Sequence, residues 1–186
     1  MAEPGLTVVK VGGAICRDPA ALRIALEAIG RLGRHQPLVV VPGGGAFADQ
    51  VRLAQRALGF SDDAAHWMAI LAMDQVAQLI ADRLARAGLV HDPAEIAAAQ
   101  RAGLIPVLAP HAWMRRVDAL PHSWDVTSDS IAAFIAEALG AKVLILLKRV
   151  DGPVEALVDR AFSTIRPAGL AVRVATPATL ELPAIG

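Results

Sequence analysis

Two lysines of this sequence stand where apolar segments end, in positions suited to contact a phosphate group. Lys10 closes the apolar run that starts at Leu6, and a glycine pair follows shortly after. Lys148 closes the run of residues 143–147. The chain has only three lysines among its eighteen basic residues, so arginine supplies most of the basic side chains that keep the surface solvated. Because a lysine ammonium is a compact, mobile charge, these positions predict a phosphate-binding site.

Two glycine turns point to the same chemistry. Gly12 and Gly13 follow the first apolar run, and Gly43, Gly44 and Gly45 follow the second. Backbone N–H groups in such turns can approach an anion closely. Ligands of open parallel sheets bind at the carboxyl ends of the strands, so we expect one turn to hold the donor phosphate and the other the acceptor. Two simple strand-to-helix turns remain the plainer alternative.

Asp129 lies in the first turn of an expected helix and is the candidate partner of the lysines. An aspartate there either caps the helix and complements its dipole, or it holds the lysines, or a metal, beside the phosphates. His111, His122 and Asp125 lack the spacing of metal ligands, so we predict no metal–histidine site.

Other nucleotide-binding motifs fit less well. No lysine is followed by Ser or Thr, which excludes the Walker A loop of P-loop NTPases. Residues 43–48 match the G-x-G-x-x-G/A pattern, with Asp62 or Asp63 near the ribose-binding distance. However, this pattern is not on the first strand, and the acidic residues fall at a helix cap. A dinucleotide-binding Rossmann protein is therefore kept as the weaker alternative.

Apolar runs alternate with helical patterns along the chain, which indicates the α/β class. Strands are expected at residues 6–11, 38–41, 104–108, 142–147 and 170–175, and helices at 18–32, 46–58, 61–87, 93–102 and 127–139. Continuous apolar strands are typical of parallel sheets covered on both faces. We predict a three-layer sandwich with a mainly parallel, twisted sheet. Residues 111–124 are expected to be irregular, either a substrate loop or a packed connection.

The longest expected helix carries two apolar lines. One runs through Trp67, Ile70, Met73, Ala77, Ile80 and Leu84, and the other through Met68, Ala72, Val76 and Leu79. Two such lines cannot both face one flat sheet. Either the helix is sandwiched within the core, or the second line contacts a second copy of the chain. We predict a homodimer through residues 62–87.

Composition and charge exclude several classes of protein. At 186 residues and 55% hydrophobic content, the chain can form one domain with a sizeable core, or one lobe and a fragment of another. Its formal net charge is zero, so no nucleic-acid partner is expected. No apolar run reaches the ~18 residues of a membrane span. Cys16 is the single cysteine, which fits a small buried residue in a reducing compartment. Residues 1–5 lack signal-peptide features, so we expect a cytoplasmic protein.

Four segments together resemble the amino acid kinase family, which includes acetylglutamate, carbamate, aspartate, uridylate and isopentenyl phosphate kinases. They are residues 9–13, 41–45, 127–133 and 150–152, and they occur in the family's order and spacing over residues 6–152. Residues 63–74 are similar to a narrower branch, the furfuryl phosphate kinases of methanofuran and methylofuran biosynthesis in one-carbon metabolism. The resemblance implies an amino acid kinase fold and ATP- and Mg²⁺-dependent phosphoryl transfer to a small acceptor, preferably a phosphomonoester.

The resemblance also implies roles for the matching residues. Lys10 would stabilise charge on the transferred phosphoryl group, and Asp129 would orient the lysines. The residues expected to bind the nucleotide are Gly12, Gly13, Arg149, Asp151 and Gly152, and those expected to bind the acceptor are Gly43, Gly44, Gly45, Thr127 and Ser128.

The chain departs from the family pattern after Asp151. Residues 1–152 correspond to the kinase core with its acceptor and phosphate sites, and residues 153–186 to a shortened nucleotide lobe of the same domain. The family's second lysine commonly comes from that later half, but no lysine follows Asp151 here. Lys148 or Arg149 is expected to take its place. A non-catalytic binding or regulatory subunit on a kinase scaffold is therefore the alternative function.

Overall fold

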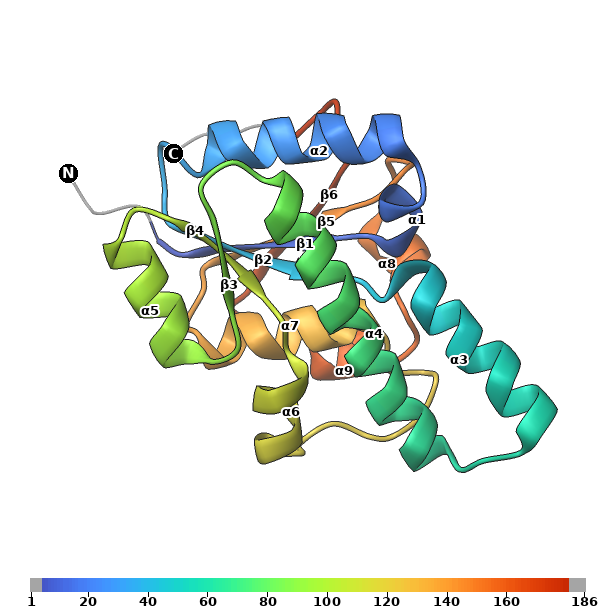
Figure 1. The fold of residues 1–186 in the computed structure, drawn as a ribbon. Helices are drawn as coiled ribbons and strands as arrows, with labels where there is room; N and C mark the ends of the chain where they lie inside the picture. The colour runs from blue at the N-terminus through green and yellow to red at the C-terminus, as the bar shows by residue number, and fades with distance from the viewer. Residues whose placement is uncertain (1–4, 181–186) are drawn as a thin grey trace.

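The computed structural model describes residues 5–180 and has three layers, with a sheet between two layers of helices (Figure 1). Within these residues the sheet has six parallel strands in the order β3-β4-β2-β1-β5-β6. The strands are β1 (Thr7–Val11), β2 (Leu38–Pro42), β3 (Ala87–Val90), β4 (Ile105–Leu108), β5 (Val143–Leu147) and β6 (Ala171–Ala175). Helix α2 (Pro19–Leu32) covers one face, and α7 (Ser128–Ala138) covers the other (Figure 1). The predicted α/β sandwich is confirmed.

Strand β1 lies at the centre of the sheet and carries Lys10 into the interior. Lys10 is in register with Val41 of β2 and Leu146 of β5. Because side chains alternate along a strand, Lys10 shares a face with Val8, which packs in the apolar core on the α7 side. Val9 packs in the second core, beneath α2. A lysine therefore lies on a wholly buried strand.

The helix ends follow local signals in the sequence. Asp18 caps α2 by accepting hydrogen bonds from the amides of Ala20 and Ala21 at 3.0 and 3.1 Å. Gly59, at φ +70°, ends α3 (Gly45–Leu58) in the left-handed conformation. Ser61 caps α4 (Asp62–Arg83). The other helices are α1 (Gly13–Cys16), α5 (Pro93–Arg101), α6 (His111–Val117), α8 (Val154–Leu157) and α9 (Phe162–Ile165).

Helix α4 is shorter than predicted. It ends at Arg83, and the chain then turns through Arg86, at φ +62°, into strand β3. Residues 87–90 pair with residues 105–108 of β4. The alanine-rich sequence suits a helix, but pairing with β4 extends the sheet and overrides that local preference. The helix predicted over residues 61–87 is wrong at this end.

The segment of residues 111–124 begins with a helix, although we predicted it to be irregular. Helix α6 buries Trp113 and Met114 in the core on the α7 side. The amide of His111, at its start, donates a hydrogen bond to Asp74 of α4 at 3.0 Å. This contact is made across 37 residues of sequence, so no local capping signal announces the helix.

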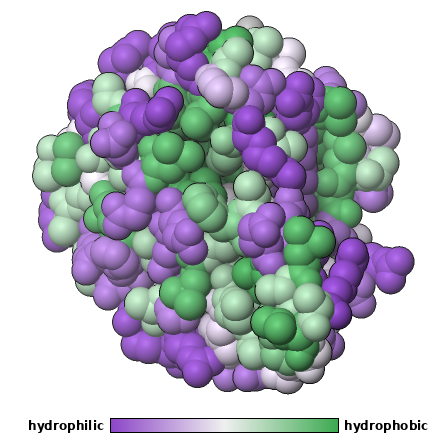
Figure 2. Space-filling model, turned by 45° about the vertical axis from the view of Figure 1, so that its right-hand side comes forward, coloured by the Kyte–Doolittle hydropathy of each residue, from purple (hydrophilic) through white to green (hydrophobic). Residues whose placement is uncertain are grey.

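The apolar width of α4 is explained within one chain. Ala72 and Val76, from the line assigned to a dimer, are each only 1% exposed and lie beside the second glycine turn. Met68 and Leu71 are 39% and 42% exposed. Figure 2, with the α3 side turned forward, shows hydrophobic areas separated by hydrophilic ones. Part of the second line, Ala72 and Val76, is therefore buried within one chain, and the homodimer stays a prediction.

The described part of residues 153–186 belongs to the same sheet and core. Strand β6 pairs with β5, and Phe162 of α9 is buried in the core on the α7 side. Residues 1–4 and 181–186 lie outside the described residues. Among residues 5–180, no helix combines the length and apolar character needed to cross a membrane.

Candidate active site

The two glycine turns touch each other at the carboxyl ends of β1 and β2. A Cβ atom on Gly13 would lie 2.7 Å from the Cα atom of Gly45, and one on Gly43 would lie 3.0 Å from the amide nitrogen of Gly13. Gly45 has a positive φ of 54°, which an L side chain rarely adopts. The prediction that both turns share one edge is confirmed, and backbone contact explains why this pair must be glycine.

A lysine–aspartate–lysine bridge lies next to these turns. The ammonium of Lys148 donates a hydrogen bond to Asp129 Oδ2 at 2.7 Å. Lys10 Nζ forms an ion pair with Asp129 Oδ1 at 2.8 Å. The three side chains come from β1, from the first turn of α7 and from the residue after β5. Of the two candidates for the second lysine, Lys148 is therefore the one that reaches Asp129.

The bridge carries a net positive charge in a buried place. Burial raises the pKa of Asp129, but the charges of Lys10 and Lys148 outweigh that effect, so its pKa lies below the usual value. Burial, followed by the charge of Lys10, lowers the pKa of Lys148 although Asp129 opposes the shift. With Asp129 ionised and both lysines protonated, one positive charge remains for a phosphate.

Asp159 fixes the first turn of α7, and sequence reasoning missed it. One carboxylate oxygen accepts hydrogen bonds from the amide and hydroxyl of Thr127, at 3.0 and 2.7 Å, and from the amide of Ser130 at 3.1 Å. The other oxygen accepts from the Ser130 hydroxyl. Thus Asp159 occupies the capping role considered for Asp129, whose carboxylate faces the lysines instead. No local pattern could reveal a partner about 30 residues away.

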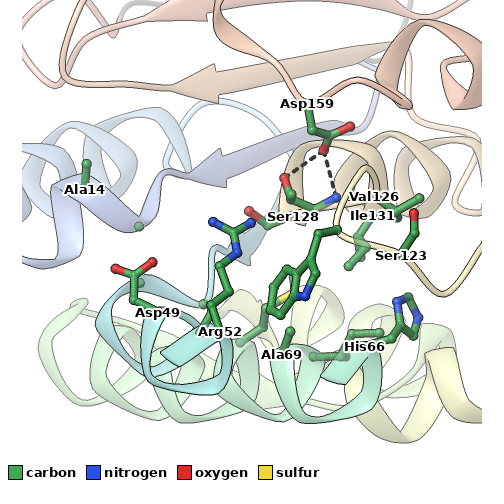
Figure 3. A pocket seen from close by; sticks show the side chains of 18 of the residues that line it. Ala14, Asp49, Arg52, His66, Ala69, Ser123, Val126, Ser128, Ile131 and Asp159 are labelled. Atoms are coloured by element: carbon green, nitrogen blue, oxygen red, sulfur yellow. Dashed lines mark hydrogen bonds between the residues drawn. The ribbon is translucent and has the colours of Figure 1, made fainter. Parts of the chain in front are cut away.

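A cavity of about 360 Å³ opens beside the glycine turns, between α3, α4 and the start of α7 (Figure 3). Of the predicted acceptor-binding residues, Gly44, Gly45, Thr127 and Ser128 line it. Gly43 is absent from its walls but lies next to Ser128. The other lining residues are Gly13, Ala14, Arg17, Ala48, Asp49, Arg52, Asp62, His66, Ala69, Ile70, Met73, Ser123, Trp124, Val126, Ile131 and Asp159.

Arg52 and Trp124 are further lining residues that the sequence did not reveal. The Arg52 guanidinium lies 4.3 Å from the centre of the Trp124 ring. The indole N–H of Trp124 donates a hydrogen bond to Gln55 at 2.6 Å, which fixes the ring. Arg17 pairs with Asp49 at 2.6 Å, whereas Arg52 has no carboxylate partner within residues 5–180. Its guanidinium is available to an anionic ligand.

Three of the residues expected to bind the nucleotide lie apart from the cavity. Arg149 pairs with Asp18, the cap of α2, at 3.1 Å. The carboxylate of Asp151 accepts a hydrogen bond from the amide of Gly152. Arg149, Asp151 and Gly152 are all absent from the cavity's lining.

The side chains considered earlier as metal ligands or as a reactive thiol make ordinary structural contacts. Both ring nitrogens of His122 contact carboxylates, of Asp63 and Asp118. Over residues 5–180, no three His, Cys, Asp or Glu side chains are grouped to hold a metal ion. Cys16 is partly buried, and burial raises the pKa of its thiol to about 11, which makes it an inert thiol.

The sequence of the chain is similar to those of known proteins. The sequence profile of the amino acid kinase family matches residues 5–153. The (5-(aminomethyl)furan-3-yl)methyl phosphate kinase of Methanocaldococcus jannaschii is 32% identical over 148 residues, which are 78% of this chain and 66% of that relative. The chain thus spans slightly less than two thirds of this relative's length.

Solved structures show the same fold. Uridylate kinase from Archaeoglobus fulgidus superposes with a TM-score of 0.70 at 19% identity, over 94% of this chain and 92% of that one. Aspartate kinase from Synechocystis gives 0.71 at 18% identity, over 95% of this chain and 38% of that one. Because the family profile covers most of the sequence and the fold agrees with it, the chain belongs to the amino acid kinase family.

Proposed function

We propose that the chain is a small-molecule kinase that transfers a phosphoryl group from ATP to a small acceptor. The observation that carries this proposal is the bridge of Lys10, Asp129 and Lys148 beside two touching glycine turns. It is a buried, positively charged place where two anion-binding turns meet. Phosphoryl transfer is catalysed by positioning and charge stabilisation, so no covalent nucleophile is required.

The roles follow from the positions of the groups. Lys10 and Lys148 neutralise charge on the phosphoryl group in flight, and Asp129 holds the two ammonium groups apart and in place. The turn of Gly12 and Gly13 binds the nucleotide's terminal phosphates, with Arg149, Asp151 and Gly152 on the nucleotide side. The turn at residues 43–45, together with Thr127 and Ser128, binds the acceptor.

The expected Mg²⁺ would be held by the phosphates of ATP, because the two carboxylates at the start of α7 already have partners. Both oxygens of Asp129 contact lysines, and both oxygens of Asp159 accept hydrogen bonds from α7. Neither carboxylate is free to bind a metal directly. Bound together with ATP, Mg²⁺ would supply further positive charge to the phosphates.

The acceptor is a phosphomonoester similar to furfuryl phosphate, in the synthesis of a methylofuran-type one-carbon cofactor. The name of the M. jannaschii relative supports this substrate class. The cavity supports it physically, because unpaired Arg52 stands ready for a phosphate and the Trp124 ring offers a flat apolar wall.

An ADP-release assay with ATP and Mg²⁺ tests the proposal, with furfuryl phosphate, UMP, carbamate and N-acetylglutamate as acceptors. Lys10→Ala should lower turnover about a hundredfold or more, since one charge-stabilising donor contributes about 3–4 kcal/mol. Lys142→Ala is the matched control, because this exposed third lysine lies outside the site. Unchanged turnover in Lys10→Ala would overturn the proposed mechanism.

A binding or regulatory subunit on a kinase scaffold is the second candidate. It is favoured by the lack of any lysine after Asp151 in this sequence, where the family's second lysine commonly lies. Mg-ATP at a hundredfold excess over its dissociation constant should stabilise a kinase by roughly 2–3 kcal/mol, measured as thermal shift. A protein that is stabilised by an acceptor and not by Mg-ATP would favour the second candidate.

We also propose that the protein is a homodimer in the cytoplasm. Met68 and Leu71 leave apolar surface on α4 for a second copy. Light scattering at micromolar concentration should find twice the mass of one chain, and Met68→Glu should reduce it to a single chain. A single-chain mass for the unaltered protein would contradict the dimer.

A further inference from the structure

One wall of the acceptor cavity is an irregular segment. Residues 118–127, called here the wall segment, join α6 to α7 without forming a helix or a strand. Four of them line the cavity: Ser123 and Val126, which lie beside it in Figure 3, and Trp124 and Thr127. Because no helix or sheet ladder holds this segment, its shape depends on a few contacts with the rest of the fold.

His122 makes one of these contacts by joining α4 to the end of α6. Its Nδ1 lies 2.6 Å from a carboxylate oxygen of Asp63, in the first turn of α4, and its Nε2 lies 2.8 Å from one of Asp118, which follows α6. The ring stacks on that of His66 at 4.3 Å and lies nearly perpendicular to that of Trp67, at 5.0 Å between ring centres. The contact with Asp63 spans 59 residues of sequence, so it ties the wall segment to α4.

This His122 bridge needs a protonated ring. A neutral imidazole carries one N–H, so it could donate to one carboxylate only, and its other nitrogen would direct a lone pair at the second carboxylate. The imidazolium donates to both. Burial lowers the pKa of His122, but hydrogen bonds to Asp118 and Asp63 and the charges of these carboxylates outweigh it, so its pKa lies above the ordinary value of 6.5. The bridge is therefore formed below this raised pKa and weakens as pH rises through it.

The other ionisable groups of this cluster leave the positive charge on His122. Burial, followed by the charge of His122, lowers the pKa of His66 to about 4, so His66 is uncharged at neutral pH. Arg115 of α6 lies over the Trp67 ring at 4.5 Å, and His111 contacts the edge of the same ring at 6.2 Å. Within residues 5–180, the ion pairs of His122 are those with its two bridging carboxylates.

We propose that protonated His122 is a positioning residue for the acceptor, because its bridge holds the wall segment, and with it Trp124, against the cavity. This inference rests on the proposed kinase function. Trp124 follows His122 by two residues, and its ring lies 4.3 Å from the Arg52 guanidinium. When the ring loses its proton, the segment is released from α4 and the acceptor binds more weakly. Asp159 fixes the start of α7 separately, so the geometry around the lysines is kept.

Acceptor kinetics at about pH 6 and pH 9 test this role, with furfuryl phosphate as the acceptor. His122→Phe keeps an aromatic ring to stack on His66 but cannot form the bridge. Its KM should be about fivefold above that of the unaltered protein at pH 6, the size expected for two partly exposed ion pairs, and nearly equal to it at pH 9. Comparing the two proteins at the same pH cancels the ionisation of the phosphate itself. The kcat of the variant should be little changed.

Two further variants serve as an independent test and a control. Asp63 is 67% exposed and does not line the cavity, so Asp63→Asn should fold and should show part of the same pH-dependent difference in KM. Asp125→Asn is the matched control, because it removes a carboxylate of the same segment that pairs with Arg160 instead, at 3.6 Å. Its KM should follow that of the unaltered protein. If the KM of His122→Phe and of Asp63→Asn, relative to the unaltered protein, is the same at both pH values, the proposal is overturned.

An NMR titration without nucleotide or acceptor separates this inference from the proposed function. In the full chain, the indole N–H signal of Trp124 should move with the same pH midpoint as the ring signals of His122, and this step should be absent in His122→Phe. A His122 midpoint below 6.5, or a Trp124 signal that stays fixed through it, would contradict the bridge. If no acceptor supports ADP release but the two signals still titrate together, the kinase proposal fails and the hold of His122 on the wall segment stands.

Discussion

Asp159 accepts hydrogen bonds from both the amide and the hydroxyl of Thr127, at 3.0 and 2.7 Å, and so ties residues after β5 to the start of α7. Asp129 lies two residues further along that helix turn. We expect Asp159→Ala to shift Asp129 relative to Lys10 and Lys148. The variant should lose about 2 kcal/mol of unfolding free energy in urea, because buried donors are left unpaired.

Measuring kcat shows whether Asp159 positions the catalytic groups or only stabilises the fold. Asp159→Ala should lower kcat about tenfold at a temperature where circular dichroism shows it folded, with the KM for acceptor changed less. Ser163→Ala is a suitable control, since Ser163 is an exposed residue of the neighbouring α9. A folded Asp159→Ala variant with unaltered kcat would show that Asp159 is structural only.

We expect deprotonation of Lys148 to set an alkaline limit, that is, a pH above which activity is lost. Burial and the charge of Lys10 lower the pKa of Lys148 below its usual value near 10.5. Since the protonated form stabilises phosphoryl charge, kcat should fall as pH rises through this lowered pKa. Lys148→Arg should move the limit to higher pH, because arginine stays protonated. The pH profile of kcat measures this, and an identical alkaline limit in both proteins would exclude Lys148 as its source.

The sheet could be predicted because its strands are continuous apolar runs. Residues 6–11, 38–41 and 142–147 have the Val, Leu and Ile content of strands buried on both faces, and all three form neighbouring strands. Strand β3 could not be predicted in this way. Residues 87–90 include alanine and glycine, and only pairing with β4 makes them extended.

The meeting of Lys10, the glycine turns and Asp129 could be predicted, but most of the cavity's walls could not. Lys10, the glycine turns and Asp129 stand next to strand ends or helix starts, where their positions in space follow from topology. Arg52, Trp124 and Asp159 reach the cavity through long-range contacts, such as the Trp124 hydrogen bond to Gln55 across 69 residues. Nothing local in the sequence distinguishes such side chains from ordinary surface residues.

We expect the stabilisation that Asp129 gives the folded protein to be lost at acidic pH. Its pKa is lowered in the folded protein, so its stabilising effect is present above the unfolded pKa near 3.9 and is lost as pH falls through the folded value. Asp129→Asn should reduce the unfolding free energy by about 3 kcal/mol at pH 7, because Lys10 is left buried and unpaired. Urea titrations should show this difference narrowing below pH 4. A difference that is constant from pH 7 to pH 3 would contradict the ion-pair account.

Gly13 is expected to be irreplaceable because of backbone contact. A Cβ atom there would lie 2.7 Å from Gly45 Cα and 2.8 Å from Gly45 N, and backbone atoms cannot move aside as a side chain can. Gly13→Ala should therefore separate the two turns. We expect a loss of about 2 kcal/mol in unfolding free energy and weaker binding of both Mg-ATP and the acceptor, measured by calorimetry.

Gly169 supplies the matched control for the same substitution. A Cβ atom on Gly169 would meet nothing within 4 Å, and its φ is not positive. Gly169→Ala should leave binding unchanged and raise or hold stability, since alanine restricts the unfolded chain more than glycine does. Equal binding by Gly13→Ala and Gly169→Ala would mean that contact between the turns is not required for the site. Weak binding by Gly13→Ala alone would instead assign the phosphate site to the meeting point of the two turns.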